Sequence, residues 1–270
     1  MIHRPSVDIR SFLGAVGRVF AVFFPQGRKA RRTRFFFLLT FLPVAVSLVI
    51  KFNQIFSGRT GSGNGYLFSN LIMLFYLQLI VLILALFYGT SVCSEEVEGK
   101  TLPYLITRPI PKAAVVLGKY AAYTAVVTAM VTLGLVLSFL VLNLDRLLDA
   151  AVYRTFGLYL GVLILAAMAY GALFTFLGSF LKRSIFFGLL FCFGWENVIQ
   201  YFPGSTQRLA IAHYLKSFLP ATSSGRFSIL TFRLEPTARP IALLMLFLIT
   251  AALLALACLV FMKKDYILDD

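Results

Sequence analysis

Residues 241–262, IALLMLFLITAALLALACLVFM, form an apolar stretch that contains no charged side chain. A helix needs roughly 20 mostly apolar residues to cross the hydrocarbon core of a membrane. This stretch is therefore predicted to be a membrane-spanning helix. Further stretches of similar length and character lie at residues 35–52, 67–92, 115–142, 156–181 and 185–202.

The composition of the whole chain also indicates a membrane protein. Of its 270 residues, 60% are hydrophobic and 13% are charged, whereas soluble domains average roughly 25% charged residues. A soluble protein of this size cannot bury so much apolar surface, which excludes a cytosolic enzyme, a secreted disulfide scaffold and a disordered protein. Because the stretches lack the alternation of membrane β-strands, we predict an all-α membrane protein with six transmembrane helices.

The distribution of basic residues predicts the orientation of the chain in the membrane. With six spans both termini lie on one side, and that side receives most of the 25 Lys and Arg residues, including the cluster at residues 28–34. Short loops rich in Lys and Arg stay in the cytoplasm, so both termini are predicted to be cytoplasmic. The net charge of +14 then reflects topology, and no nucleic acid partner is expected.

The N-terminal segment is predicted to contain an interfacial helix. At the helical period Phe12 and Val19 share an apolar face, whereas Arg10 lies on the opposite face, and such a helix suits the cytoplasmic leaflet. The alternative is a helix packed against a neighbouring subunit. Pro25-Gln26-Gly27 is expected to end this helix. The chain thus divides into a cytoplasmic segment, a transmembrane domain and a cytoplasmic tail, at residues 1–34, 35–262 and 263–270.

Residues suited to catalysis or metal binding are scattered along the chain. Cys93, Cys192 and Cys258 form no C-x-x-C pair, and His3 lies far from His213. These spacings support neither a disulfide framework nor a metal site. We therefore expect a chain that is not an enzyme and that holds no catalytic site, metal or cofactor of its own.

One short sequence resembles part of a nucleotide-binding motif. Gly99-Lys100-Thr101 matches the end of the phosphate-binding loop G-x-x-x-x-G-K-[ST]. The first glycine of that motif is replaced by Ser94, and three glutamates in between would repel phosphate groups. A membrane helix precedes this sequence where the motif requires a strand, so ATP is not expected to bind here.

The cytoplasmic loop at residues 93–114 is predicted to be a contact surface. Ser94 can cap a short helix whose first turn contains Glu95 and Glu96, near the positive end of the helix dipole. The two prolines in Arg108-Pro109-Ile110-Pro111-Lys112 then impose an extended elbow. The alternative is an ordinary solvated connector.

The sequence of this loop resembles the signature of ABC-2 type transporter permeases, through EGKTLPYLITRPIPK at residues 98–112 and the later Leu117-Gly118-Lys119. It is most similar to the NosY-like branch, in which the ATPase is a separate subunit. The resemblance implies a permease that moves its substrate across the membrane, with export as the expected direction. It places contacts with the ATPase at Glu95, Glu96, Glu98, Thr101, Arg108 and Lys112.

The same resemblance implies the partners and the location of the chain. Two permease copies, as a homodimer or a similar heterodimer, are expected to combine with two ATPase subunits. ATP and Mg would be bound by the ATPase subunits, and the complex would lie among the lipids of the cell inner membrane. The substrate stays open, because no substrate-reading motif is visible.

Polar residues interrupt the fifth predicted span. A charged side chain at membrane depth costs roughly 2.5–3.5 kcal/mol, so Glu196, with Asn197 and Gln200, is a candidate for the translocation path or a dimer seam. The alternative is that Glu196, beside Trp195, reaches the membrane interface. Residues 206–219 of the outer loop (203–240) are predicted to form a short amphipathic helix. Small residues of the fourth span are predicted to permit close helix packing, namely Gly157, Gly161, Gly171 and Gly178.

Two other classes of function compete with the permease. An ion-coupled secondary transporter would carry buried ionisable residues in several spans, and only Glu196 approaches this. A membrane anchor or assembly protein would use the loop at residues 93–114 to recruit a soluble partner.

Overall fold

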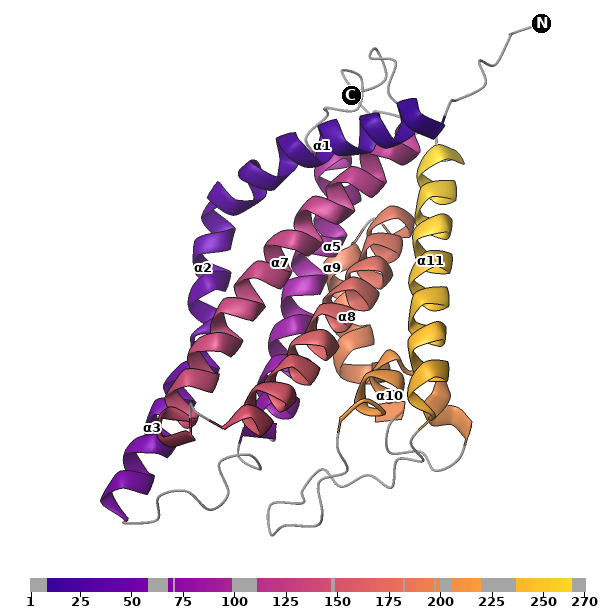
Figure 1. Cartoon of the computed structure of the whole chain (residues 1–270). Helices are drawn as coiled ribbons and strands as arrows, with labels where there is room; N and C mark the ends of the chain where they lie inside the picture. The colour runs from indigo at the N-terminus through magenta and orange to yellow at the C-terminus, as the bar shows by residue number, and fades with distance from the viewer. Residues whose placement is uncertain are drawn as a thin grey trace, which may run out of the picture.

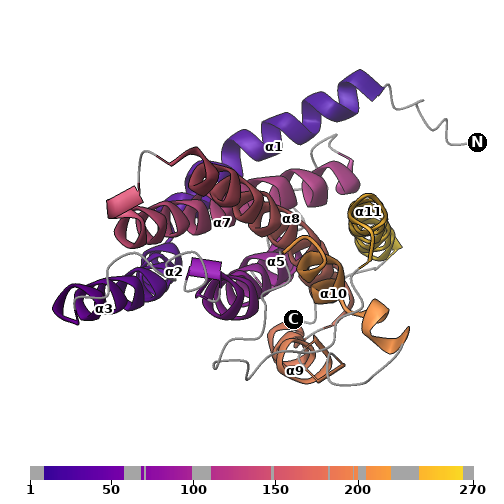
Figure 2. The same cartoon turned by 60° about the horizontal axis from the view of Figure 1, so that its bottom comes forward.

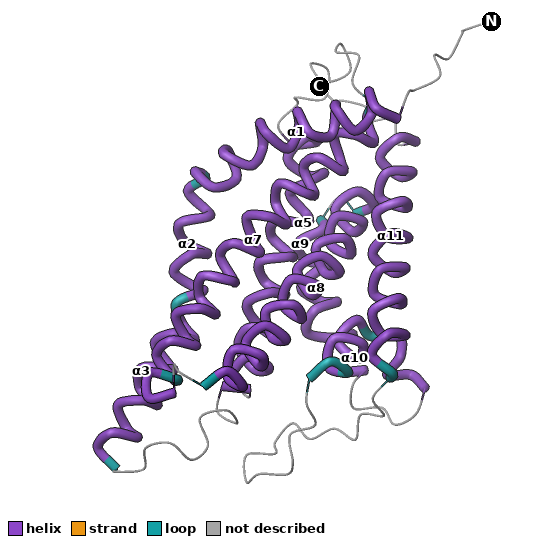
Figure 3. The backbone as a smooth tube through the Cα atoms, viewed as in Figure 1, coloured by secondary structure: helices purple, strands orange, loops and turns teal. Residues whose placement is uncertain are grey.

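The computed structural model of the chain is a helical bundle (Figures 1 and 3). It describes a set of segments, and within these the secondary structure is helical, without strands. The segments are residues 9–57, 68–69, 71–98, 111–146, 149–181, 183–196, 198–199, 205–219 and 237–263.

Five helices in the described segments are long and apolar enough to cross a membrane. They coincide with the first, second, third, fourth and sixth predicted spans, and their bounds are Arg31–Phe56, Phe75–Cys93, Lys112–Leu142, Val152–Phe180 and Arg239–Lys263. The fifth predicted span is represented by a shorter apolar helix, Ser184–Glu196, made of α9 (Ser184–Leu190) and the π-helix η3 (Phe191–Glu196).

The N-terminal helix α1 (Ile9–Lys29) lies across one end of the bundle, here called the α1 end (Figure 1). It continues through Pro25, so the expectation that Pro25-Gln26-Gly27 ends the helix is wrong. The turn comes instead at Ala30, which has an extended backbone (φ −59°, ψ 142°). Proline removes one helical hydrogen bond but does not forbid a helix whose neighbouring turns are held by packing.

The first membrane-crossing segment begins directly after this turn. It consists of α2 (Arg31–Thr40) and α3 (Leu42–Phe56), which meet at Phe41, just before the proline in the first turn of α3. Proline is favoured in the first turn of a helix, where its missing N–H group has no helical partner, and the new helix α3 begins at this position. The crossing therefore starts a few residues earlier than the predicted boundary at residue 35.

The centre of the bundle is formed by α5 (Val81–Glu98), α7 (Lys112–Leu142) and α8 (Ala150–Phe180). The π-helix η1 (Ile72–Ile80) leads into α5, and α11 (Arg239–Lys263) packs against α7 and α8 (Figure 2). Several large side chains are fully buried between these helices, and they include Tyr76, Tyr88, Tyr159, Tyr170 and Phe174.

Close approach of α8 to α5 and to α7 depends on glycine. A Cβ atom at Gly178 would lie 2.7 Å from the carbonyl oxygen of Thr90, and one at Gly171 would lie 3.2 Å from Oγ1 of Thr124. The predicted packing role is therefore confirmed for Gly171 and Gly178. At Gly157 and Gly161 a Cβ atom would meet no described atom within 4 Å, so the prediction is wrong there within this chain.

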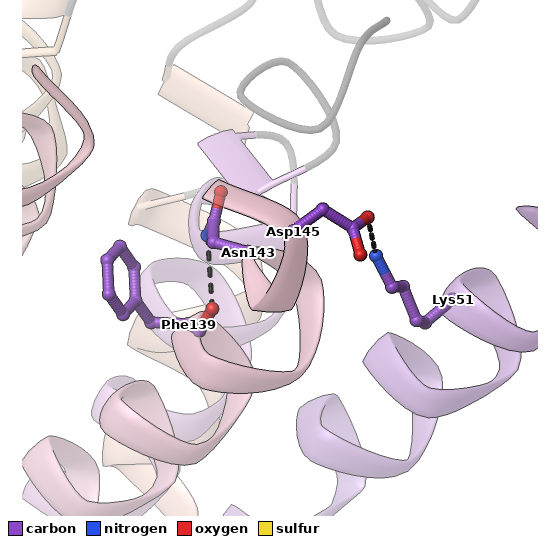
Figure 4. A network of polar contacts seen from close by, with 4 residues as sticks. All are labelled: Lys51, Phe139, Asn143 and Asp145. Carbon is purple, nitrogen blue, oxygen red and sulfur yellow. Dashed lines mark hydrogen bonds and ion pairs between the residues drawn. The ribbon is translucent and has the colours of Figure 1, made fainter. Parts of the chain in front are cut away.

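At the end opposite α1, a second set of contacts joins the first crossing to α7. Lys51 of α3 is buried and forms an ion pair with Asp145, in the short helix η2 (Leu144–Arg146) that follows α7 (Figure 4). The side-chain amide of Asn143 donates to the Phe139 carbonyl at 3.1 Å and ends α7 there. The ion pair therefore joins α3 to the end of α7.

The segment predicted as an amphipathic helix at residues 206–219 contains two short helices, of which the second is buried and is not a surface helix. It contains the short helix η5 (Ser205–Leu209) and α10 (Ile211–Lys216). Every residue of α10 is buried, because the helix is wedged against α8 and α11. The segment therefore closes this end of the bundle from within the chain.

Candidate functional site

Two polar clusters lie at opposite ends of the bundle. The first, here called the elbow cluster, consists of Arg32, Thr33, Tyr88, Ser91, Lys119 and Tyr123 at the α1 end. The second, here called the Glu196 cluster, consists of Tyr170, Glu196, Ala212 and Lys216 at the opposite end.

Arg32 is the centre of the elbow cluster. Its Nη1 atom donates a 2.7 Å hydrogen bond to Oγ of Ser91 in α5. Its guanidinium group lies 5.2 Å from the ring centroid of Tyr88 and 5.4 Å from that of Tyr123 in α7. Arginine over aromatic rings gains about 0.5–2 kcal/mol from the cation–π interaction. A single side chain of α2 thus holds both α5 and α7.

Thr33 extends this connection to α1. Its hydroxyl donates to the backbone carbonyl of Gly27 in the last turns of α1, and it also shares a buried hydrogen bond with the hydroxyl of Tyr88. The turn between α1 and α2 is therefore attached to the interior of the bundle on both of its sides.

Lys119 is buried in α7, with 2% of its surface exposed. Its ammonium group donates to the carbonyl of Val92 in α5 at 3.5 Å and lies 4.5 Å from the ring centroid of Phe23 in α1. Burying a cation is costly unless other groups replace its water. Here the Val92 carbonyl and the Phe23 ring replace it, and Lys119 thereby joins α7 to α5 and α1. From the sequence, Lys119 was interpreted as an orientation signal and as part of the ABC-2 signature, although it is the only charged residue at positions 113–144.

The elbow cluster lies beside the two ends of the predicted contact loop. Glu95, Glu96 and Glu98 fall in the last turns of α5, which runs through Ser94 without a break, so the expectation that Ser94 caps a new helix is wrong. The side chains of these glutamates are outside the described part of the structure. Thr101 and Arg108 lie outside the described residues altogether. Lys112, the first residue of α7, is half-buried and follows the N-cap residue Pro111.

The Glu196 cluster is built around a buried carboxylate at the end of η3. Only 1% of Glu196 is exposed. Its Oε1 atom accepts hydrogen bonds of 2.6 Å from the hydroxyl of Tyr170 in α8 and of 2.6 Å from the backbone N–H of Ala212 in α10. The carboxylate therefore points into the chain and joins η3 to α8 and α10. Asn197 and Gln200 lie outside the described residues.

Two ionisable groups of α10 are affected by burial. Burial lowers the pKa of Lys216 to about 8, and the negative charge of Glu196 opposes this by favouring the protonated amine. The pKa of His213 is also lowered, by burial and by the charge of Arg208. Nε2 of His213 hydrogen-bonds Oγ1 of Thr237 at 2.9 Å, just before α11 begins.

Both clusters hold helices in register. In the elbow cluster cationic side chains tie α1 and α2 to α5 and α7, and in the Glu196 cluster a carboxylate ties η3 and α10 to α8. Neither Tyr170 nor Ala212 was identifiable from the sequence as a partner of Glu196, because they come from segments far apart along the chain.

The family comparison agrees with this architecture. Residues 28–195 match the family described as ABC-2 family transporter protein, which is more than half of the chain. This protein therefore belongs to the ABC-2 family of transporters. Comparison with curated proteins finds no matching relative.

Family membership makes the chain a membrane component of an ABC transporter, a permease that crosses the membrane several times. Members of this family generally work with an ABC ATPase. The matched region begins in the last turn of α1 and ends within η3, so it contains the whole elbow cluster and the loop between α5 and α7.

Proposed function

We propose that this chain is the membrane-spanning subunit of an exporter whose ATP is bound, with Mg, and hydrolysed by a separate ATPase chain. The family match carries the proposal. The position of the elbow cluster supports it, since the helices on both sides of the loop at residues 93–114 are fixed to the α1–α2 turn. A NosY-like organisation, with separate subunits, is part of the proposal.

The loop at residues 93–114 is proposed as the docking site of the ATPase. It connects α5 to α7, and both helices are held by Arg32 and Lys119. A displacement of the loop would therefore shift α5 and α7 together with the turn between α1 and α2. The residues proposed to contact the ATPase are Glu95, Glu96, Glu98, Thr101, Arg108 and Lys112.

We propose six crossings, with the segment at 184–199 as the fifth in order. Its helix, Ser184–Glu196, spans about 20 Å at roughly 1.5 Å per residue, which is less than a full bilayer. Buried α10 packs against α8 and α11 at the end of the bundle opposite α1. An even number of crossings is supported by the start of α1 and the end of α11, which lie at the same end of the bundle (Figure 1).

The basic residues at this shared end favour a cytoplasmic location for both termini. Within the cell inner membrane we propose a complex of two permease copies, identical or similar, and two ATPase subunits. Apolar side chains on α2, α3, α9 and α11 are widely exposed in the single chain, and they are available to lipid and to the second copy.

The residues proposed earlier for a translocation path or a dimer seam now separate into two groups. The buried hydrogen bonds of Glu196 with Tyr170 and Ala212 favour a bracing role for this carboxylate. Asn197 and Gln200, which follow it, keep the proposed role at the path or the seam.

Copurification under native conditions tests the docking proposal. A tag on this chain is expected to bring down an ATP-hydrolysing subunit from solubilised membranes, and Arg108→Glu should reduce the recovered subunit several-fold. Arg154→Glu is the matched control, because it reverses one charge at the opposite end of the bundle, in the first turns of α8. Equal recovery with Arg108→Glu and wild type, or equal loss with both variants, would refute docking at this loop.

A further inference from the structure

A cavity of about 450 Å³ lies between the α1–α2 turn and α7. Its walls are mainly apolar and come from three helices: Phe24 of α1, Phe37 and Leu38 of α2, and Val126, Met130 and Leu133 of α7. Leu38 is 70% exposed and Leu133 is 43% exposed, so the cavity opens sideways at the outer surface of the bundle. Because α2 and α7 both belong to membrane-crossing helices, this opening lies at the depth of lipid chains.

Two arginines line the same cavity near the α1–α2 turn. Arg28 belongs to the last turn of α1 and Arg34 to the first turn of α2, and both side chains are exposed. Among the described residues no acidic side chain forms an ion pair with either arginine. The sequence explains this, since it contains no Asp or Glu at any position from 9 to 94. Both guanidinium groups are therefore available to a negatively charged group from outside this part of the chain.

We propose that the cavity binds one acidic glycerophospholipid. The phosphate lies between Arg28 and Arg34, and one acyl chain enters between α2 and α7 against Met130 and Leu133. Arginine forms strong, charge-assisted hydrogen bonds with phosphate oxygens. Basic pockets between membrane helices at the cytoplasmic side are typical sites for acidic headgroups. The proposal rests on α1 lying along the cytoplasmic membrane surface and is independent of the ATPase.

The position of the charges favours a lipid as the occupant. The arginines lie at the turn where the chain passes from the interfacial helix into the bundle, and the apolar wall begins directly below them. An acidic phospholipid has the same arrangement, with a charged group at the interface and a flexible apolar chain below it. Bound there, it would fill the space under α1 and hold the turn against α7.

Native mass spectrometry of the full-length chain tests this site. The protein, with any copurifying subunits, is extracted from vesicles that contain equal amounts of phosphatidylglycerol and phosphatidylcholine. Wild type is expected to retain one phosphatidylglycerol per chain in preference to phosphatidylcholine. Arg28→Ala/Arg34→Ala should lower this retention at least about tenfold, since each arginine near an anionic headgroup contributes roughly a fivefold effect. Lys29→Ala/Arg31→Ala removes the same charge from the same turn without touching the cavity, and should change retention less than about twofold.

A second variant tests the apolar half of the site without changing any charge. Ala129 of α7 is exposed and lines the cavity, so Ala129→Trp should fill the cavity and also abolish retention. If the double arginine variant fails to fold, lipid retention by Ala129→Trp still tests whether the cavity binds the lipid. Equal losses in the two charge variants, equal retention of phosphatidylcholine, or unchanged retention in Ala129→Trp would each overturn the proposal. Disulfide cross-linking of Leu133→Cys between two copies in phosphatidylglycerol vesicles would also overturn it, because a second copy would then cover the cavity.

Discussion

Gly118 of α7 lies directly against Val19 of α1, so that a Cβ atom at position 118 would be 2.6 Å from the Cβ atom of Val19 and 2.9 Å from the carbonyl oxygen of Val16. Both distances are shorter than atoms of this kind can approach, and the second involves backbone, which cannot rotate away. The absence of a side chain at Gly118 is therefore what allows α1 to lie flat on α7.

Gly118→Ala is expected to lift α1 from α7 and to destabilise the chain by about 1–3 kcal/mol, as overpacking does in close-packed cores. Thermal unfolding in detergent measures the effect. Gly161→Ala is the matched control, because the new Cβ atom meets no described atom within 4 Å; alanine there should be neutral or slightly stabilising. Equal destabilisation by both variants would contradict the tight contact at Gly118.

Arg32→Lys should weaken the elbow cluster although it keeps the positive charge. Lysine lacks the planar guanidinium group that lies over Tyr88 and Tyr123 while donating to Ser91. The expected loss is about 1–2 kcal/mol of unfolding free energy, measured by denaturant titration in detergent. Arg31→Lys, at the neighbouring exposed position, should leave stability unchanged. A similar loss in both variants would show that only the general basicity of the turn matters.

Glu196→Leu should be far more harmful than Glu196→Gln. Leucine leaves the hydroxyl of Tyr170 and the N–H of Ala212 without their acceptor, at about 1–3 kcal/mol for each buried donor. Glutamine keeps one acceptor oxygen and should cost much less. Limited proteolysis of the segment at 205–219, together with thermal unfolding, measures whether α10 has detached. If both variants behave like wild type, the carboxylate does not brace this end.

The protonation of Lys216 should make the unfolding free energy of the chain depend measurably on pH in the alkaline range. Its pKa is about 8 in the folded chain and about 10.4 when unperturbed. Between these values the unfolded state binds more protons, so the contribution of Lys216 to stability should rise as pH increases from about 8 to about 10.4. The unfolding free energies of wild type and Lys216→Met are measured across this range. The value for wild type should rise relative to that for Lys216→Met as pH increases. A constant difference would contradict burial of the amine.

The sequence predicted the positions of the long apolar helices well, but it predicted poorly where a helix breaks or continues. The length of its apolar stretch was enough to locate α11, because residues 241–262 contain no charged residue, proline or glycine that would interrupt a membrane-spanning helix. The continuation through Pro25 was missed, since proline is a local signal and the packing of α1 against Gly118 comes from a distant part of the chain.

For the charged residues too, the local sequence indicated which ones are unusual, but their contacts depend on the tertiary structure. Glu196 was recognised as unusual from its apolar surroundings, but its partners Tyr170 and Ala212 belong to other helices and no periodicity relates them. Lys119 and Arg32 were interpreted as orientation signals, because a positive charge near a helix end fits that rule whether or not it is buried. The position of both residues beside aromatic rings, with Lys119 buried and Arg32 half-buried, becomes visible only once α1, α2, α5 and α7 are assembled.

The central claim is that this chain is a permease driven by a separate ATPase, and ATP hydrolysis tests it most directly. The complex purified through a tag on this chain should hydrolyse ATP in liposomes, and the activity should disappear when the partner is removed by washing. The chain alone should neither bind nor hydrolyse ATP. Hydrolysis by the isolated chain, or ion-driven uptake by the isolated chain in liposomes without ATP, would contradict the account.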